Sequence, residues 1–170
     1  MRGSLLAALA LAAACRPSAQ PPRQDRRQTI EGLTLSQSDA GRPAWTLRSR
    51  LALLLEDANT ADLDAPDMDF YRDGRVSSHV KSLTGIVDTV THDVRLSSSV
   101  VLDSFEDHSR LTTEVLLYSS KTGRFHTDEE VTVHRPEGVA YGKGLDATPD
   151  LSEVHIFHQH SVLTGKAQSP

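Results

Sequence analysis

Four turn-forming segments divide the chain and limit the regular elements between them to short runs. Each segment places a glycine after polar residues or proline, a composition typical of reverse turns. The runs between and beyond the turns are rich in Val, Leu, Thr and Tyr, and most of them alternate apolar with polar residues, as half-buried strands do. The turn segments are Asp39-Ala40-Gly41, Arg72-Asp73-Gly74, Lys121-Thr122-Gly123 and Pro136-Glu137-Gly138, and the runs cover residues 33–36, 76–82, 94–102, 111–118, 131–133 and 154–160. The pattern predicts an all-β fold.

One segment competes with this interpretation. Residues 45–58 (WTLRSRLALLLEDA) are rich in Leu, Ala, Arg and Glu, which favours a helix on local propensity by a small margin. The same segment also alternates, with Trp45, Leu47 and Ser49 on one side of an extended chain. Because strand pairing can override local propensity, the rest of the chain favours a strand here.

Composition excludes several classes of protein. At 170 residues the chain has room for one domain, and its mean hydropathy of −0.36 argues against a polytopic membrane protein. A single cysteine excludes a disulfide framework, a cysteine zinc cluster and a CxxC pair. No glycine-rich phosphate loop occurs, so ATP or NAD chemistry is not expected.

Charge separates the N-terminal segment from the body of the chain. Residues 1–29 contain five arginines and one acid, so the remaining residues carry a net charge of −9 out of the total of −5. An acidic body argues against nucleic-acid binding. The basic, Pro- and Gln-containing stretch at residues 16–29 is typical of a flexible tether.

The N-terminus has the pattern of an export signal. Residues 5–14 (LLAALALAAA) form an apolar run too short to span a bilayer, and small residues precede Cys15. This resembles a bacterial lipobox, in which the cysteine is lipidated. An ordinary signal peptide cleaved after Ala12 or Ala14 is the alternative. We expect a signal peptide over residues 1–14, lipidated Cys15 and a tether over 15–29, one β domain over 30–164 and a disordered tail over 165–170.

Six local patterns, in order along residues 31–163, resemble the LptC family of the lipopolysaccharide export machine. They are the turn and strand at residues 39–49, the Leu63–Gly74 stretch with Pro66 and Phe70, SHVKSLTG at 78–85, RLTTEVLLY at 110–118, FHTDEEVTV at 125–133, and Gly142-Lys143-Gly144-Leu145 with residues 151–156. Two departures stand out. Ser98-Ser99-Val100 replaces the usual Gly-Asn-Val, and Ser78 replaces a Trp.

The resemblance implies a single antiparallel β-jellyroll, an open and twisted roll that shields acyl chains of lipopolysaccharide in its interior. It implies no enzyme activity and no cofactor or metal. It also implies two partners, an inner-membrane LptF/LptG/LptB-type transporter at the N-terminal edge and an LptA-type bridge protein at the C-terminal edge. The expected location is the periplasmic face of the inner membrane through a lipid anchor. Because Arg16 and not Asp follows Cys15, the outer membrane stays open as an alternative.

Carried onto this sequence, the resemblance selects aliphatic residues on alternating positions. The lipid-binding groove is predicted to contain Leu47, Val80, Leu96, Val100, Leu102, Leu111, Leu116 and Val133, and the partner edge Val154, Ile156 and Phe157. Ordinary core packing is the alternative for each aliphatic residue, and a register error of one residue would reverse every assignment. Gly142 and Gly144 have the character of close-approach or bulge positions.

The sequence also contains candidates for other chemistry and allows another function class. His155, His158 and His160 cluster near the C-terminus, but no third metal ligand is fixed by spacing, and the acids Asp128, Glu129 and Glu130 are typical of a solvated loop. Ser97-Ser98-Ser99 has no nucleophile-elbow context. The alternative function is a surface lipoprotein whose β domain binds a protein or glycan without lipid transport. A soluble LptA-type bridge is disfavoured by the predicted anchor.

Overall fold

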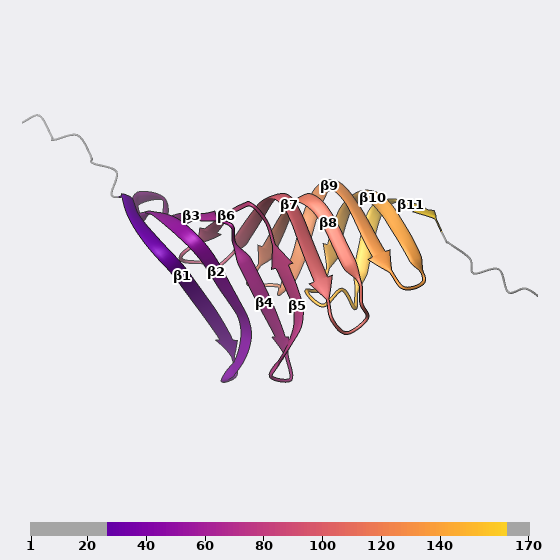
Figure 1. The fold of residues 1–170 in the computed structure, drawn as a ribbon, viewed down its shortest axis with the longest axis horizontal. Helices are drawn as coiled ribbons and strands as arrows, with labels where there is room; N and C mark the ends of the chain where they lie inside the picture. Colours follow the sequence, from indigo (N-terminus) through magenta and orange to yellow (C-terminus); the bar gives the residue numbers. More distant parts are fainter. Residues whose placement is uncertain (1–26, 163–170) are drawn as a thin grey trace, which may run out of the picture.

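Eleven antiparallel strands form one rolled sheet in the computed structural model, which describes residues 27–162 (Figure 1). The strands are β1 (Arg27–Asp39), β2 (Arg42–Leu55), β3 (Thr60–Asp64), β4 (Asp67–Arg72), β5 (Arg75–Lys81), β6 (Thr84–Asp88), β7 (Val94–Ser104), β8 (Arg110–Ser119), β9 (Arg124–Arg135), β10 (Gly138–Ala147) and β11 (Val154–Val162). The all-β jellyroll prediction is confirmed. The predicted signal, Cys15, most of the tether and the tail lie outside the described residues.

The segment with helical propensity is a strand. β2 takes up Arg42–Leu55, and only Glu56–Ala58 forms a short 3₁₀ turn. Along its length β2 pairs with β1 on one side and with β4 and then β3 on the other. Burial of Trp45, Leu47 and Ser49 on its inner face requires the extended period of two, so tertiary pairing outweighs the small helical preference.

The roll has two walls that meet at a crease. One half of β2 pairs with β4 and the other half with β3, while β7 likewise divides between β5 and β6. We call the wall containing β4 and β5 the first wall and the wall containing β3 and β6 the second wall. The longer strands cross from one wall to the other. The turns at the strand ends form two rims opposite the crease, and we call the gap between the rims the mouth.

Both halves of a bent strand point their apolar side chains into the roll. In β2 the buried positions change from odd numbers (Trp45, Leu47) to even (Ala52), and in β8 from Leu111 to Leu116 and Tyr118. The β8 change coincides with a register shift against β9. In β10 a shift falls at Gly144, whose φ is +76°. In β2 and β8 two consecutive residues, Arg50-Leu51 and Glu114-Val115, lie between inward-facing positions. That is one residue more than strict alternation allows, so both arms face inward.

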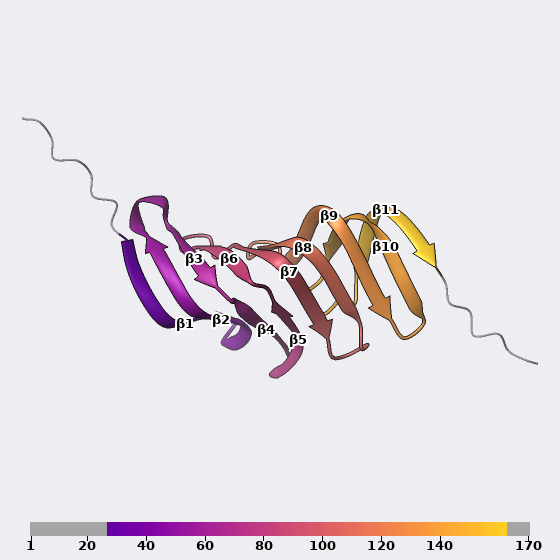
Figure 2. The same ribbon diagram turned by 45° about the horizontal axis from the view of Figure 1, so that its top comes forward.

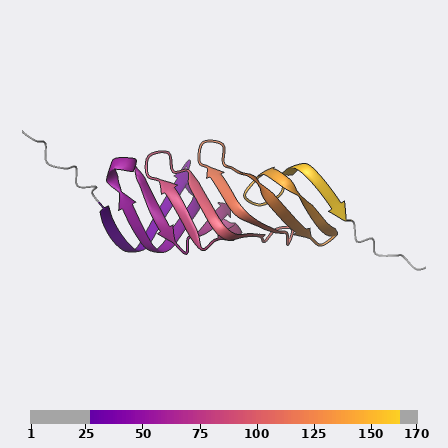
Figure 3. The same cartoon turned by 90° about the horizontal axis from the view of Figure 1, so that it is seen from above.

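The two edges of the sheet lie at opposite ends of the roll. β1 pairs only with β2, and β11 only with β10, among residues 27–162. Figures 1 and 2 and the view from above in Figure 3 all place β1 (indigo) and β11 (yellow) at the two ends of the long axis. Each end of the roll therefore presents a strand with one side free of sheet pairing within the described chain.

At the crease of β7, two serines adopt a backbone conformation that L-residues rarely take. Ser98 and Ser99 have φ of 67° and 56°, and both side chains are exposed. They lie in the register shift between β7 and β8. These are the positions where the family pattern has Gly-Asn, the two residue types that tolerate positive φ. The structure thus gives a physical reason for the pattern and identifies strain in this chain.

We expect the double substitution Ser98→Gly, Ser99→Asn to stabilise the protein by about 1 kcal/mol, because it relieves two left-handed conformations at exposed positions. Urea unfolding measures the change. The control is Ser97→Gly, which lies one residue earlier in the regular part of β7 and should destabilise the strand by roughly 0.5–1 kcal/mol. Equal losses from both variants would contradict strain at the crease.

Candidate functional site

The interior of the roll is lined by rows of side chains that run across the strands along its whole length. On the first wall, each residue of what we call the deep row lies opposite the next in the sheet register. From β1 to β10 this row is Leu35, Leu47, Met68, Val80, Leu102, Leu111, Val133 and Ala140. Every member is apolar, so the row is an unbroken hydrocarbon surface.

The second wall carries a matching deep row. It consists of Ile30, Ala52, Leu63, Gly85, Leu96 and Leu116 across β1, β2, β3, β6, β7 and β8, and it continues as Thr127, Leu145 and Ile156 across β9, β10 and β11. Thr127 is its one polar side chain and is buried. The interior therefore has an apolar surface on both walls.

All eight residues predicted for the groove are buried in this interior, each with at most 1% of its surface exposed. Five belong to the deep row of the first wall, Leu96 and Leu116 belong to that of the second wall, and Val100 lies at the crease opposite Thr113. The structure thus brings the eight residues together on one inner surface. Lipid binding by these residues stays a prediction.

Burial falls off at both ends of the rows. The central members are fully buried, whereas the members contributed by the outermost strands are only partly covered. The partly covered residues are Ile30, Leu33 and Leu35 in β1, Ala140 in β10, and Val154 and Ile156 in β11. The apolar interior therefore reaches the free edge of the described sheet at each end.

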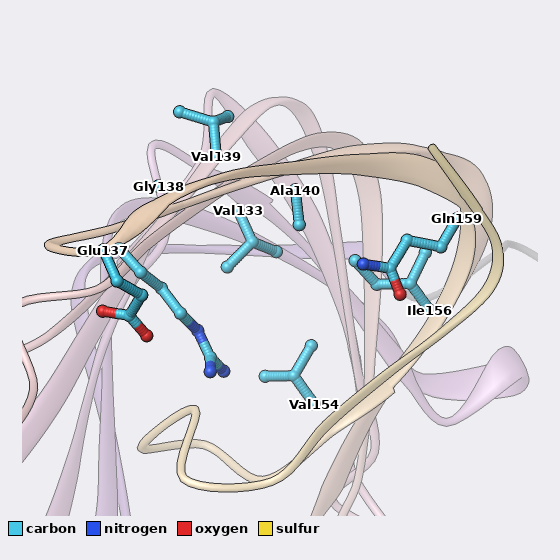
Figure 4. A pocket seen from close by; sticks show the side chains of 9 residues that line it. Val133, Glu137, Gly138, Val139, Ala140, Val154, Ile156 and Gln159 are labelled. Atoms are coloured by element: carbon cyan, nitrogen blue, oxygen red, sulfur yellow. The ribbon is translucent and has the colours of Figure 1, made fainter. Parts of the chain in front are cut away.

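At the C-terminal end the interior opens into a cavity of about 240 Å³ between β9, β10 and β11. Val133, Ala140, Val154 and Ile156 face this space in Figure 4. Arg135, Glu137 and Gln159 supply its polar lining. Of the predicted partner edge, Val154 and Ile156 line the cavity, whereas Phe157 lies outside it and is 47% exposed.

The two glycines near this edge allow β11 to approach β10 closely. A Cβ at Gly142 would clash with Ile156 Cγ2 and would lie 2.6 Å from the His158 carbonyl oxygen. At Gly144 a Cβ would meet the Phe157 ring at 2.7 Å. The predicted close approach is confirmed at both glycines.

Aromatic rings from both walls close the central part of the mouth. Trp45 and Phe70 come from the first wall, and Tyr118 and Phe125 from the second. The Phe70 ring centroid lies 5.0 Å from that of Tyr118 and 5.3 Å from that of Phe125, and Trp45 lies 6.3 Å from Tyr118. We call these four residues the aromatic clasp. Burial raises the pKa of Tyr118 to about 12, helped by the nearby Asp93 charge, so its phenol stays neutral.

Further toward the C-terminal end, the connection between β10 and β11 lies across the mouth. We call residues 148–153 the strap. The Asp150 carboxylate pairs with Arg72, its carbonyl accepts a hydrogen bond from Ser104 Oγ at 2.6 Å, and Leu151 is fully buried. Arg135 Nη2 donates to the Leu151 carbonyl at 3.2 Å. The strap thus joins the rim of the second wall to β4, β7 and β9 of the first wall.

Sequence reasoning missed both closing features. The clasp residues come from four strands, and their proximity depends on the crease that superposes the walls. The strap is a short polar connection, and its sequence does not indicate that Asp150 and Leu151 contact the opposite wall. The histidine cluster has no convergence of three His, Cys, Asp or Glu side chains within the part of the chain that the structure describes. Instead, the His155 ring packs on Phe157 with centroids 5.2 Å apart, and Asp128, Glu129 and Glu130 are exposed at the crease of β9.

A family comparison agrees with this geometry. Residues 5–162 match the family model described as lipopolysaccharide-assembly, LptC-related. The chain belongs to the LptC family. No curated protein matches it. LptC proteins take part in lipopolysaccharide transport at the cell envelope and are not an enzyme family. Within the described residues, the structure contains no helix of the length and apolarity that a membrane span requires.

The Asp150 side chain is a titratable anchor of the strap. Its burial opposes ionisation, but hydrogen bonds from Thr148 and Ser152 and the charge of Arg72 outweigh that effect and lower the pKa of Asp150. A carboxyl whose pKa is lowered by folding stabilises the folded state above its unfolded-state pKa. That contribution is lost as the pH falls through the folded-state pKa.

We expect Asp150→Asn to destabilise the protein by roughly 1–3 kcal/mol at pH 7, because the Arg72 pair is lost. The difference from the parent should narrow as the pH falls below about 4. Urea unfolding over a pH series measures both effects. Asp62→Asn makes the same charge change on the exposed side of β3 and should have little effect. A difference that does not vary with pH would contradict the ionic anchor.

Proposed function

We propose that this LptC-family chain is the lipopolysaccharide-binding component of the export machine, which passes lipid from the inner-membrane ABC transporter to an LptA-type bridge. The observation that carries the proposal is the course of the two deep rows along the roll. Both rows begin at the free edge strand β1, and the second-wall row reaches the other free edge strand, β11. Aliphatic walls suit acyl chains, because burial of hydrocarbon contributes about 25 cal/mol per Å² without directional contacts. The family membership supports the same cargo.

The partners follow from the two edges. β1 and β11 each have one side free of pairing within residues 27–162, so a strand of another roll can add to either by main-chain hydrogen bonds. Partly covered Ile30 and Leu35 at one end, and Val154 and Ile156 at the other, would then be covered by the next roll. We assign β1 to the LptF/LptG/LptB-type transporter and β11, with Val154, Ile156 and Phe157, to the bridge. Stacked in this way, the rolls share one continuous apolar interior.

Transport along this interior requires the mouth to open. The sugars of lipopolysaccharide are too polar to enter the core, so the chains must lie between the walls while the sugars project through the mouth. The Trp45 and Phe70 rings must then separate from Tyr118 and Phe125. The structure corresponds to the closed state, in which the rings fill the space that the chains would take.

The clasp also supports the second candidate function. Because it closes the central core, the same fold serves a surface lipoprotein that binds a protein or glycan on its exterior. The two functions differ in one measurable respect: only a conduit places lipid against residues of the deep rows.

We expect a compact photoreactive amino acid at Leu102 or Leu116 to form ATP-dependent adducts with lipopolysaccharide in cells, because these positions face the interior from the two walls. The matched controls are Val101 and Leu117, the next residues on the same strands, which face outward, together with exposed Asp107. Immunoblotting for lipopolysaccharide on the purified protein measures the adducts. Their absence from both inward positions, in a folded and correctly localised protein, would favour the exterior binding module.

Membrane attachment is a separate part of the proposal. We infer that Cys15, outside the described residues, carries the lipid anchor that holds the roll at the periplasmic face of the inner membrane. Cys15→Ser should abolish incorporation of labelled palmitate and move the protein to the soluble periplasmic fraction. Cleavage of the parent after Ala12 or Ala14 without lipid incorporation would show an ordinary signal peptide. Fractionation of the two membranes distinguishes inner from outer.

A further inference from the structure

In β2 and β5 of the first wall, two polar side chains are buried without a hydrogen-bond partner among the described residues. They are Trp45, 2% exposed with Nε1 unpartnered, and Ser78, 0% exposed with Oγ unpartnered. Both lie opposite Phe70 of β4, Trp45 on the β2 side and Ser78 on the β5 side. Buried donors almost always have a partner because an unmade hydrogen bond is costly. These two groups therefore indicate an acceptor that arrives from outside the chain.

Neighbouring serines show that the local backbone can satisfy such groups. Ser77, beside Ser78, donates from Oγ to the Phe70 carbonyl at 3.2 Å. Ser104, opposite Ser78 on β7, donates to the Asp150 carbonyl at 2.6 Å. Both serines next to Ser78 are thus satisfied within the chain, whereas Trp45 Nε1 and Ser78 Oγ are not. Ser109 Oγ, beyond the end of β7, is likewise buried without a partner.

The level of these two residues in the roll identifies the kind of acceptor. They belong to the row nearest the mouth, and the row below them contains only apolar side chains, with Leu47, Met68 and Val80 directly beneath. An acylated sugar whose chains lie on the deep rows and whose sugar lies outside must place its ester or amide linkages between the two. That position is the mouth row.

We propose that Trp45 Nε1 and Ser78 Oγ donate hydrogen bonds to carbonyl oxygens of the ester and amide linkages that join acyl chains to the sugar. This inference rests on the proposed lipid-carrying function and adds residues that recognise the linkage. An indole N–H is a donor only, so it requires an acceptor such as a carbonyl and gains nothing from a hydrocarbon chain. The two residues are separated by one strand, about 10 Å, so they contact linkages of different chains.

The test compares two synthetic lipid A probes with the same sugar, phosphates and chain lengths. One has ester and amide linkages, and the other has ether and amine linkages that lack the carbonyl oxygens. Binding to the purified full chain in detergent is measured by calorimetry. We expect the parent to bind the carbonyl probe about fivefold more tightly, the contribution of a net hydrogen bond.

Three variants assign the preference to residues. Trp45→Phe keeps an aromatic ring in the clasp but removes the N–H, and Ser78→Ala removes one oxygen; each should reduce the preference. Ser77→Ala is the matched control, because it removes a hydroxyl from the adjacent residue whose hydrogen bond is already made. It should leave the preference unchanged. Circular dichroism checks that each variant is folded.

The outcomes separate this inference from the proposed function. Equal binding of both probes by the parent, or an unchanged preference in Trp45→Phe and Ser78→Ala, would overturn linkage recognition and leave lipid carriage intact. Failure of the parent to bind either probe would count against the lipid-carrying function itself and against the inference with it.

Discussion

Every long strand of this protein must bend at the crease and still point apolar side chains inward on both sides of the bend. Side chains of a strand alternate strictly between two faces. In β2 or β8, a bend without an added residue would therefore turn the apolar side chains of one arm outward. The extra residues at the crease solve this problem, and they determine the register of the rows. Because the rows exist only when all strands bend in step, the continuous apolar interior depends on these local irregularities.

The sequence supports prediction where signals are local. The turns, the strands between them and the burial of the eight aliphatic residues follow from glycine placement and alternation. The lengths of the strands and the crease do not, because a bulge changes the face of a residue without changing the composition of the run. The LTTEVLLY segment illustrates this: Leu111 and Leu116 both point inward although they have opposite parity. The resemblance to a family supplied the jellyroll architecture that periodicity alone left open.

Closure and passage are opposing requirements on the same interior. A roll open along its mouth would expose a long apolar surface to water, whereas a sealed roll could not admit a lipid whose sugars stay outside. The clasp and the strap meet the first requirement with contacts of different kinds. The clasp is held by ring packing and a neutral phenol, and the strap by an ion pair, hydrogen bonds and one buried leucine. The central and C-terminal parts of the mouth are therefore closed by separate interactions.

The divided pairing of β2 and β7 gives the roll a mechanical property. Through β4 and β5 on one wall and β3 and β6 on the other, these two strands complete a hydrogen-bonded ring of six strands within the described chain. A ring has no end from which its strands can be peeled one at a time. Tension applied between the two ends of the roll would reach β1 or the β8–β11 extension first, because these parts are held from one side only. The ring would keep the two walls together while the outer strands separate from their neighbours and pair again.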